Sequence, residues 1–242
     1  MFNLEKRFLE KNEMNDNICE CSECQFRNVA FATLAPEQVT DLCSFRQELS
    51  YQKGGIIHRE EDPIHDFKYL KSGLVKVYRQ NNAGDEQIIA ITRPFEFVSN
   101  MSIFSEERYK YSVSAIEETV ICSIKVEHIK TLVAGNGLFA LELMTKISQI
   151  TDKIILQGLD IRNRNLIGRV AYILIYFTKE IYNSRVFDLP VSRKEIADYI
   201  SMSTANVIRT LSEFRREGII KLFGKTVEIV DLDKLEIISA RG

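Results

Sequence analysis

The sequence predicts an α+β protein with three successive parts: a β-rich barrel or sandwich, one long helix, and a C-terminal helix-turn-helix with a small hairpin. Three observations indicate this order. Short segments of alternating apolar residues, separated by turn-forming residues, extend from about Leu34 to Glu127. A proline-free stretch with helical periodicity follows, from Leu138 to about Asn165. After Leu166 the chain contains shorter helical segments and a strand-like end.

Composition limits the classes of protein to consider. The chain has 242 residues, 45% of them hydrophobic, and a net charge of −2 at pH 7, which suits one large or two ordinary globular domains. The N-terminal residues are charged throughout and show no secretory signal, and the longest apolar stretch, at 170–177, is too short to cross a membrane. We therefore expect a cytoplasmic protein without a membrane partner. Any surface for nucleic acid must be locally basic, because the whole chain is not.

Four segments carry the β pattern. They are GGIIHREEDP (54–63), FKYLKSGLVKVYRQ (67–80), EQIIAITRP (86–94) and SVSAIEETVICSIK (112–125). Turn-forming pairs such as Asp62-Pro63 and Ser72-Gly73 interrupt them. Several short strands at this spacing predict an all-β barrel or sandwich.

The long helical stretch carries apolar residues that must be buried against a partner. One stripe consists of Leu143, Ile147, Ile150, Ile154 and Ile161, and a neighbouring one of Leu141, Met144, Thr151 and Ile155. The obvious partners are the β domain on one side and a second copy of the chain on the other. We assign the first stripe to dimerisation. The alternative is a helix that only covers its own barrel.

Residues 190–225 form the most specific segment of the chain. Ser192 followed by Glu195 is a capping box that starts one helix, and Ser203 offers a second N-cap. Ala197 lies where two helices would cross closely, and Ser201 lies at a tight turn between them. The apolar face of the second helix consists of Val207, Leu211 and Phe214. This is the helix-turn-helix arrangement, and an ordinary helical hairpin with solvated charges is the alternative.

The outer side of the second helix is the candidate surface for DNA. Its N-terminal half, from Thr204 to Arg209, is the part that meets base edges when such a helix enters the major groove. Gly218 ends this helix, and the strand-like residues that follow form a hairpin, or wing, with Gly224 at its tip. Seven Lys and Arg against four Asp and Glu give residues 190–225 a local charge of +3. The candidate DNA-binding residues are Ser192, Arg193, Ser203, Thr204, Ala205, Asn206, Arg209, Arg215, Lys221 and Lys225.

Together these features resemble the cyclic AMP receptor protein and fumarate-nitrate reduction (CRP/FNR) regulators. The resemblance covers about residues 30–230 and is carried by FKYLKSGLVKVYRQNNAGDEQIIAI, IGRVAYIL and VSRKEIADYISMSTANVIRTLSEFRREGII. It implies a cysteine-containing segment at 1–30, a cyclic-nucleotide-binding-type β-roll (jelly roll) at 31–137, a dimerisation helix at 138–165 and a winged helix-turn-helix domain at 166–242. It also implies a homodimeric transcription factor that binds a palindromic operator in double-stranded DNA, contacts RNA polymerase and responds to an effector in or near the roll.

The resemblance also assigns roles to single residues. Arg209 occupies the position of the family's arginine that contacts guanine, and its planar donor fork matches guanine O6 and N7. The recognition glutamate common in the family is Ala205 here, which cannot accept a hydrogen bond from cytosine. We therefore expect a different operator. Asn206 or Thr204 supplies base contacts instead, or Ala205 reads only a thymine methyl.

The effector pocket lacks the chemistry for a cyclic nucleotide. Nucleotide-binding members hold phosphate and ribose with a Gly-Glu pair and an Arg followed by Ser or Thr, because a buried phosphate needs a counter-charge and donors. This chain has Ser99-Asn100 and Arg108-Tyr109 in the corresponding segment. Cyclic AMP is therefore not expected, and the effector is unidentified.

Five cysteines, an odd number in a chain without an export signal, favour thiols or thiolate ligands over a disulfide framework. Cys43 lies in a helical segment and is expected to be a small buried apolar residue.

Four of the cysteines are a candidate metal site. The oxygen-sensing branch of the family holds an iron–sulfur cluster with three N-terminal cysteines and one in the roll. Cys21, Cys24 and Cys122 fit that pattern, but Ala30 stands where the third N-terminal ligand is expected, and only Cys19 offers a replacement. Three interpretations stay open for this set: free or redox-active thiols, an iron–sulfur cluster, or zinc. In the first two, redox state, oxygen or nitric oxide would be the effector.

Two enzyme classes are the alternatives to a regulator. A cupin-type, metal-dependent β-barrel needs a His-x-His pair, whereas His58, His65 and His128 are scattered. A thiol redox enzyme using Cys21-x-x-Cys24 would need that motif to open a helix in a βαβ unit, which the flanking sequence lacks. The chain contains neither a P-loop nor a Gly-x-Ser-x-Gly elbow. We therefore predict a regulator and not an enzyme.

Overall fold

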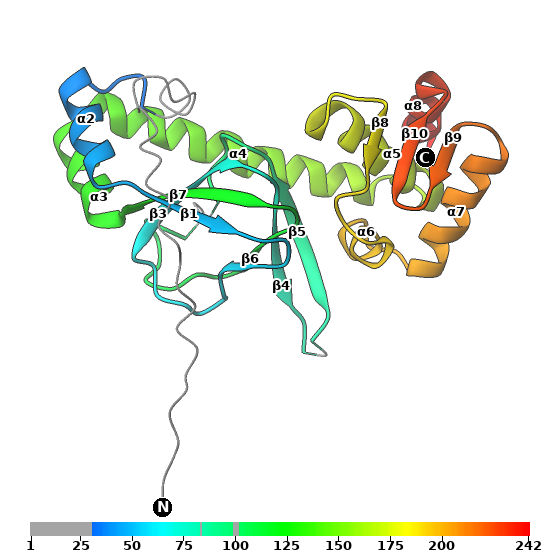
Figure 1. Ribbon diagram of the computed structural model, residues 1–242, viewed down its shortest axis with the longest axis horizontal. Coiled ribbons are helices and arrows are strands. Elements are labelled where there is room, and N and C mark those ends of the chain that lie inside the picture. Colours follow the sequence, from blue (N-terminus) through cyan, green and yellow to red (C-terminus); the bar gives the residue numbers. More distant parts are fainter. Residues whose placement is uncertain (1–30, 83, 99–101) are drawn as a thin grey trace, which may run out of the picture.

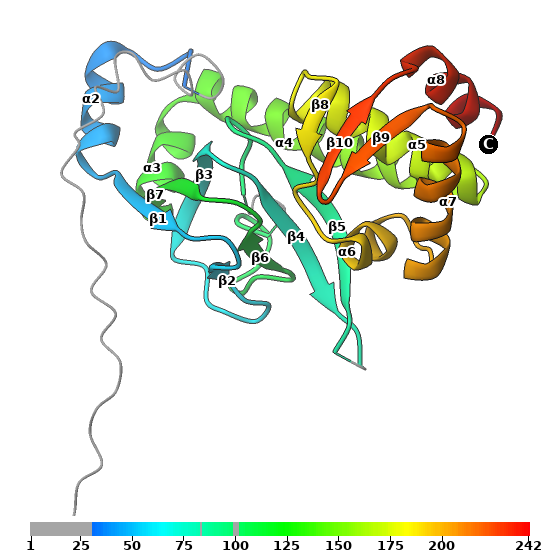
Figure 2. The same ribbon diagram turned by 45° about the vertical axis from the view of Figure 1, so that its right-hand side comes forward.

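The computed structural model describes residues 31–82, 84–98 and 102–242. Figure 1 shows a β-rich N-terminal part and a helical C-terminal part, with the long helix α4 running from one to the other. Figure 2 shows the same order after a turn of 45°. The predicted α+β architecture is therefore confirmed. Among the described residues, no helix combines the length and the apolar character needed to cross a membrane.

The β-rich part is a roll of two antiparallel sheets. One sheet has the strand order β1-β7-β3 and the other β2-β6-β4-β5. The strands are β1 (Gln47–Tyr51), β2 (Ile56–His58), β3 (Asp66–Ser72), β4 (Val75–Gln80), β5 (Glu86–Thr92), β6 (Ser112–Ala115) and β7 (Thr119–Lys125). The core of the roll is made of Ile57, Leu70, Val75, Val77, Ala90, Val98, Val113 and Ile121. These apolar side chains exclude water from the interior of the roll.

Helices cover one side of the roll. They are α2 (Pro36–Ser44), α3 (Val126–Gly135) and the first half of α4 (Gly137–Arg162). Asn136 caps α4, because its side-chain oxygen accepts a hydrogen bond from the Phe139 backbone N–H at 3.1 Å. Phe139 is then buried in a core shared by the helices and the β1-β7-β3 sheet.

The stripe of α4 that we assigned to dimerisation packs within the chain. Leu143 and Ile161 are buried, and Ile147, Ile150 and Ile154 are partly buried against apolar clusters of the same chain. That assignment needs correction, because this face of α4 packs on the roll from Leu143 to Ile154 and, at Ile161, on the core shared with the helix-turn-helix domain. The apolar residues that α4 leaves exposed are Leu138, Leu141, Met144, Ile155, Leu156 and Leu159. This second set is here called the exposed α4 stripe.

The C-terminal part is a helix-turn-helix domain with a small sheet. Its elements are α5 (Leu166–Tyr176), a π-helical turn η1 (Phe177–Ile181), β8 (Val186–Asp188), α6 (Arg193–Tyr199), α7 (Thr204–Arg216), β9 (Ile220–Phe223), β10 (Thr226–Ile229) and α8 (Leu232–Arg241). The predicted wing is present as β9 and β10. The structure adds β8, which completes a sheet of order β8-β10-β9, and α8, which packs against α5.

One apolar core joins the two parts of the chain. Leu74, Tyr78 and Ile88 of the roll belong to the same buried cluster as the residues that fill the helix-turn-helix domain. The Tyr176 hydroxyl of α5 donates a hydrogen bond to the Ile91 carbonyl of β5 at 3.1 Å. The helix-turn-helix domain is therefore packed on the outer face of the β4-β5 strand pair.

Candidate nucleic-acid interface

The first helix of the helix-turn-helix begins with the predicted capping box. Ser192 Oγ accepts a hydrogen bond from the Glu195 backbone N–H at 3.2 Å, and Glu195 Oε2 accepts from the Ser192 N–H at 2.8 Å. After α6 the chain turns at Ser201, which adopts a left-handed backbone with φ of +54°. The Met202 N–H closes this turn by donating to the Ala197 carbonyl at 2.8 Å.

The second helix is fixed from its inner side. Ser203 caps α7, its hydroxyl accepting from the Asn206 N–H at 3.3 Å. Val207, Leu211 and Phe214 are buried and belong to the same core as α6. The spacing of these three residues therefore determines which side of α7 faces outward.

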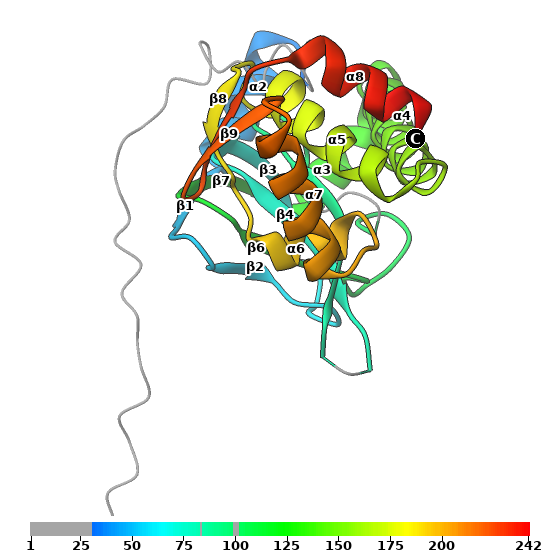
Figure 3. The same ribbon diagram turned by 90° about the vertical axis from the view of Figure 1, so that its right-hand side faces the viewer.

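The outward side of α7 carries the predicted base-reading residues. Ala205, Ile208 and Arg209 are exposed, and Thr204 and Asn206 are partly exposed. The Arg209 side chain is 66% exposed, and its Nε lies 4.0 Å from Glu213 Oε1. Figure 3 looks at this end of the molecule, with α6 and α7 toward the viewer and α4 behind. The helix thus presents a guanidinium and a row of small or amide side chains on one open face.

Two of the candidate DNA-binding residues, Arg193 and Arg215, line a groove between α7 and the wing. This groove has a volume of about 420 Å³, and its lining includes Arg193, Ile208 and Arg215. Arg193 Nη2 donates to the Gly224 carbonyl at the wing tip at 3.1 Å, which ties the start of α6 to the wing. Lys221 and Lys225 are paired with Glu228 at 2.9 Å and with Asp188 at 2.8 Å. Both lysines are more than half exposed, so these pairs are weak and open to exchange for a phosphate.

The roll segment expected to hold a nucleotide is built differently. Arg108 Nη1 donates to the Glu61 carbonyl at 2.7 Å. The Tyr109 ring is buried and stacks on His58 with 3.7 Å between ring centroids. Ser99 and Asn100, the other two residues singled out in the sequence, lie outside the described residues. Arg108 is thus engaged with the backbone of the roll.

The candidate metal ligands are only partly described. Cys19, Cys21 and Cys24 lie outside the described residues. Cys122 is fully buried in β7, and burial raises the pKa of its thiol to about 11. In the part of the chain that the structure covers, no three His, Cys, Asp or Glu side chains are grouped as metal ligands. Cys43 is partly buried against the apolar cluster that includes Val39 and Leu42, as expected of a small apolar residue, and it is disulfide-bonded and so not a free thiol.

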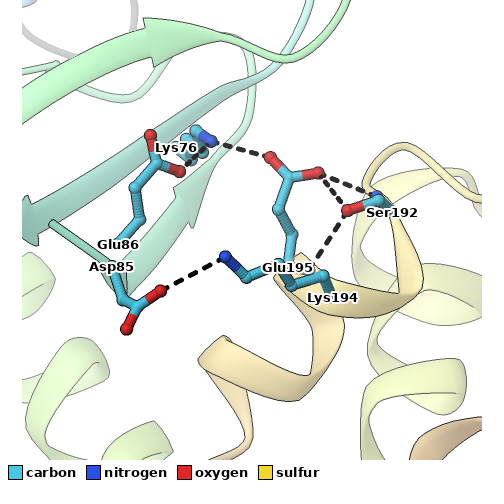
Figure 4. A network of polar contacts seen from close by, with 6 residues as sticks. All are labelled: Lys76, Asp85, Glu86, Ser192, Lys194 and Glu195. Carbon is cyan, nitrogen blue, oxygen red and sulfur yellow. Dashed lines mark hydrogen bonds and ion pairs between the residues drawn. The ribbon is translucent and has the colours of Figure 1, made fainter. Parts of the chain in front are cut away.

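A polar contact between the roll and α6 is not predicted by any local pattern of the sequence. Lys76 Nζ lies 2.7 Å from Glu195 Oε1, and Lys194 Nζ lies 3.3 Å from Asp85 Oδ1. Figure 4 shows both contacts bridging the β4-β5 strand pair and α6. Pairs more than 100 positions apart leave no local pattern in a sequence, although a lysine in the middle of an apolar strand was a visible hint.

Two family models match the chain, one for each part. The model for a cyclic nucleotide-binding domain matches residues 48–136, and the model for a Crp-like helix-turn-helix domain matches residues 168–238. The first match covers the roll and α3, and the second covers most of the C-terminal domain.

Relatives match the chain over most of its length. The transcriptional activator protein anr of Pseudomonas aeruginosa is 28% identical over 195 residues, which cover 79% of each chain. The fumarate and nitrate reduction regulatory protein of Shigella dysenteriae is 22% identical over 237 residues, 96% of this chain and 94% of that protein. The solved structure of FixK2 from Bradyrhizobium japonicum is similar in fold, with a TM-score of 0.72 at 22% identity over 80% of this chain and 96% of that one. Both parts of the chain therefore occur in the same order in these proteins.

Proposed function

We propose that this protein binds a palindromic operator as a homodimer and contacts RNA polymerase. The proposal starts from its family, because the chain belongs to the CRP/FNR family of DNA-binding transcriptional regulators. The family is not one of enzymes, so the cupin-type and thiol redox alternatives no longer apply. The observation that carries the proposal is the open outward face of α7, on which Arg209 and Asn206 lie within one helical turn of each other.

Base recognition is proposed to come from the first two turns of α7. The Arg209 guanidinium has the donor fork for guanine O6 and N7, and its loose contact with Glu213 leaves it free to move toward a base. Asn206 and Thr204 can exchange hydrogen bonds with adenine or with other base edges. Ala205 offers only a methyl group, which suits a thymine methyl.

Phosphate contacts are proposed to flank this reading face. Arg193 and Arg215 line the groove beside α7, and Lys221 and Lys225 lie on the wing. The hydroxyls of Ser192 and Ser203, at the two helix starts, complete the set. Each cationic contact releases counterions, so operator binding should weaken steeply with salt.

The homodimer is proposed to form through the exposed α4 stripe. The exposed α4 stripe places six large apolar side chains on the surface of one helix. Exposed apolar patches of this kind are typical of protein–protein interfaces. Two copies related by a two-fold axis would bury these residues against each other and place two α7 helices on one DNA. Leu141→Glu on this stripe should convert the dimer to a monomer in analytical ultracentrifugation, whereas Glu142→Gln, one position along, should not.

The effector is proposed to be redox-linked and not cyclic AMP. Arg108 Nη1 donates to the Glu61 carbonyl, and the buried Tyr109 follows it, so this part of the described roll lacks the Arg-Ser or Arg-Thr pair that holds a phosphate in nucleotide-binding members. One relative is named for fumarate and nitrate reduction, and Cys19, Cys21 and Cys24 lie within six positions of one another in the sequence. Anaerobic purification followed by iron, sulfide and zinc assays separates a cluster, zinc and free thiols. Tight binding of cyclic AMP in calorimetry would overturn this part of the proposal.

The DNA-binding function is tested by selection from a random duplex library. A palindromic consensus is expected, and Arg209→Ala should weaken binding to it by roughly 1–3 kcal/mol and relax the preference at one base in each half-site. Arg216→Ala removes the same charge at the far end of α7 and should leave base preference unchanged. Equal losses of Arg209→Ala on the consensus and on random DNA would contradict the assigned role.

A further inference from the structure

The β4-β5 strand pair has one face in the roll and the other in the DNA-binding domain. Val75, Val77 and Ala90 point into the core of the roll. Tyr78 and Ile88 belong to the core of the helix-turn-helix domain. Because side chains alternate along a strand, the same two strands contact the sensor interior and the DNA-binding domain.

A polar network lies at the edge of this contact (Figure 4). Lys76 on β4 pairs with Glu86 of β5 and with Glu195 of α6, the latter at 2.7 Å. Glu195 uses its other carboxylate oxygen for the capping box, accepting from the Ser192 backbone N–H at 2.8 Å. One side chain therefore both starts α6 and binds the roll. The Lys194–Asp85 pair adds a second, more exposed point of attachment.

Burial distinguishes Lys76 from an ordinary surface charge. Its side chain is 10% exposed and that of Glu195 is 25% exposed. Burial alone would lower the pKa of Lys76, but hydrogen bonds to Glu195 and Glu86 outweigh this and raise it. Burial would likewise raise the pKa of Glu195, and bonds from Lys76 and Ser192 lower it instead. Both groups are thus charged, and removing one of them would leave the other as a largely buried charge without its partner.

The docked arrangement leaves the DNA-reading face open. Ala205, Ile208 and Arg209 are exposed with the roll in contact with α6. Within the described chain, the roll therefore does not cover α7. This favours a contact that positions the domain for DNA over one that blocks it.

We infer that the β4-β5 strand pair, through the Lys76–Glu195 ion pair, fixes the orientation of the helix-turn-helix domain on the roll of the same chain. Lys76 and Glu195 are then positioning residues for operator binding, although neither is expected to contact a base. The inference rests on the proposed function. It adds a direct route from the sensor interior to α6 that does not pass through the dimer helix.

The test compares the affinity of each variant for a complete palindromic operator with its affinity for a single half-site. A dimer reads a palindrome only if both α7 helices meet their half-sites together, whereas a single half-site places no demand on their relative orientation. The probes are the palindromic duplex selected above and the same duplex with one half-site scrambled. The variants are Lys76→Met, which keeps the apolar stem, and Glu195→Gln, which keeps a capping-box residue. Lys71→Met is the matched control, because it removes the 2.8 Å pair with Glu48 inside the roll.

The expected result is a selective loss on the palindrome. Lys76→Met and Glu195→Gln should each weaken binding to it by about threefold to tenfold, and the double variant should weaken it no further. Binding to the single half-site should change by less than about twofold, as it should for Lys71→Met on both probes. Equal losses on the two probes, or tighter binding to the palindrome, would overturn the inference.

Hydrogen exchange gives a second measurement that needs no DNA. The amides of α6, residues 193–199, should exchange faster in Lys76→Met than in wild type or Lys71→Met, with the exchange of β7 unchanged. Unchanged α6 exchange would refute the inference even if operator binding fell. If no palindrome is selected by the wild-type chain, the proposed function fails, and this exchange experiment still decides whether Lys76 holds α6.

Discussion

His58 provides a prediction of how stability depends on pH. The residue is 4% exposed, and its ring stacks on Tyr109 with 3.7 Å between ring centroids. Among the described residues, neither ring nitrogen has a hydrogen-bond partner. Burial, and to a smaller extent the positive charge of the nearby Lys68, lower the pKa of His58 from 6.5 to about 3. The folded chain therefore holds this imidazole neutral under conditions in which the unfolded chain protonates it.

The sign and size of the effect follow from the two pKa values. Between them the unfolded state binds more protons, so the free energy of unfolding falls as the pH falls below 6.5. For a folded value of about 3, the loss between pH 7 and pH 5 is about 2 kcal/mol, and it continues toward pH 3. Carboxylates contribute mainly at the lower end of this range, so the first part of the loss belongs to His58.

The assay is denaturant unfolding, followed by circular dichroism, of wild type and His58→Phe at pH 7 and pH 5. Phe keeps a ring to stack on Tyr109 but cannot be protonated. The variant should therefore lack the loss of about 2 kcal/mol in the free energy of unfolding that wild type shows between pH 7 and pH 5. NMR titration of the imidazole provides a direct check, since His58 should stay neutral down to about pH 4. If wild type and variant lose stability in parallel over this range, or the imidazole titrates near pH 6, the reasoning is wrong.

Two further substitutions test local geometry. Gly73→Ala should lower the free energy of unfolding by roughly 2–4 kcal/mol, because a Cβ there would lie 2.3 Å from the Glu118 carbonyl oxygen. Gly54 has a similar φ, +84° against +86°, but a Cβ there would have nothing within 4 Å, so Gly54→Ala should show only the backbone strain. Equal losses for the two variants would contradict the steric account. Ser192→Ala should cost about 1 kcal/mol in thermal unfolding through the lost cap, and Ser192→Thr should recover much of it. A Ser192→Ala variant as stable as wild type would mean that the cap does not stabilise α6.

The elements predicted best were those specified by neighbouring residues. In the capping box at Ser192 and Glu195 and in the N-cap at Ser203, a side chain accepts from a backbone N–H three positions away, so the geometry is fixed by one helical turn. Gly224 likewise marks the wing, because its positive φ of +65° is unfavourable for other residues. These features can be read before anything is known of the rest of the fold.

The orientation of α4 could not be predicted in the same way. Its two apolar stripes share the helical period, and periodicity does not say which stripe meets the chain's own roll. Leu143 is buried and Leu141 exposed because of where the roll lies, which depends on contacts distant in the sequence. Size and β-branching did not separate the two sets either, since both contain leucine and isoleucine. Which stripe of α4 packs in the core of its own chain, and which is left exposed, therefore cannot be decided without the tertiary structure.

The contact between the roll and α6 could be predicted only in part from the residue pattern of β4. In β4, alternation places Lys76 and Tyr78 on the side opposite the roll core, which by itself predicts a face toward water. Both residues are buried instead, because the helix-turn-helix domain covers that face. An aromatic residue and a lysine whose charge is matched by Glu195 on the far side are typical of a contact between domains that is partly apolar and partly polar. The apolar part joins the two parts in one core, and the Lys76–Glu195 ion pair at its edge is the contact on which the inferred positioning of α6 depends.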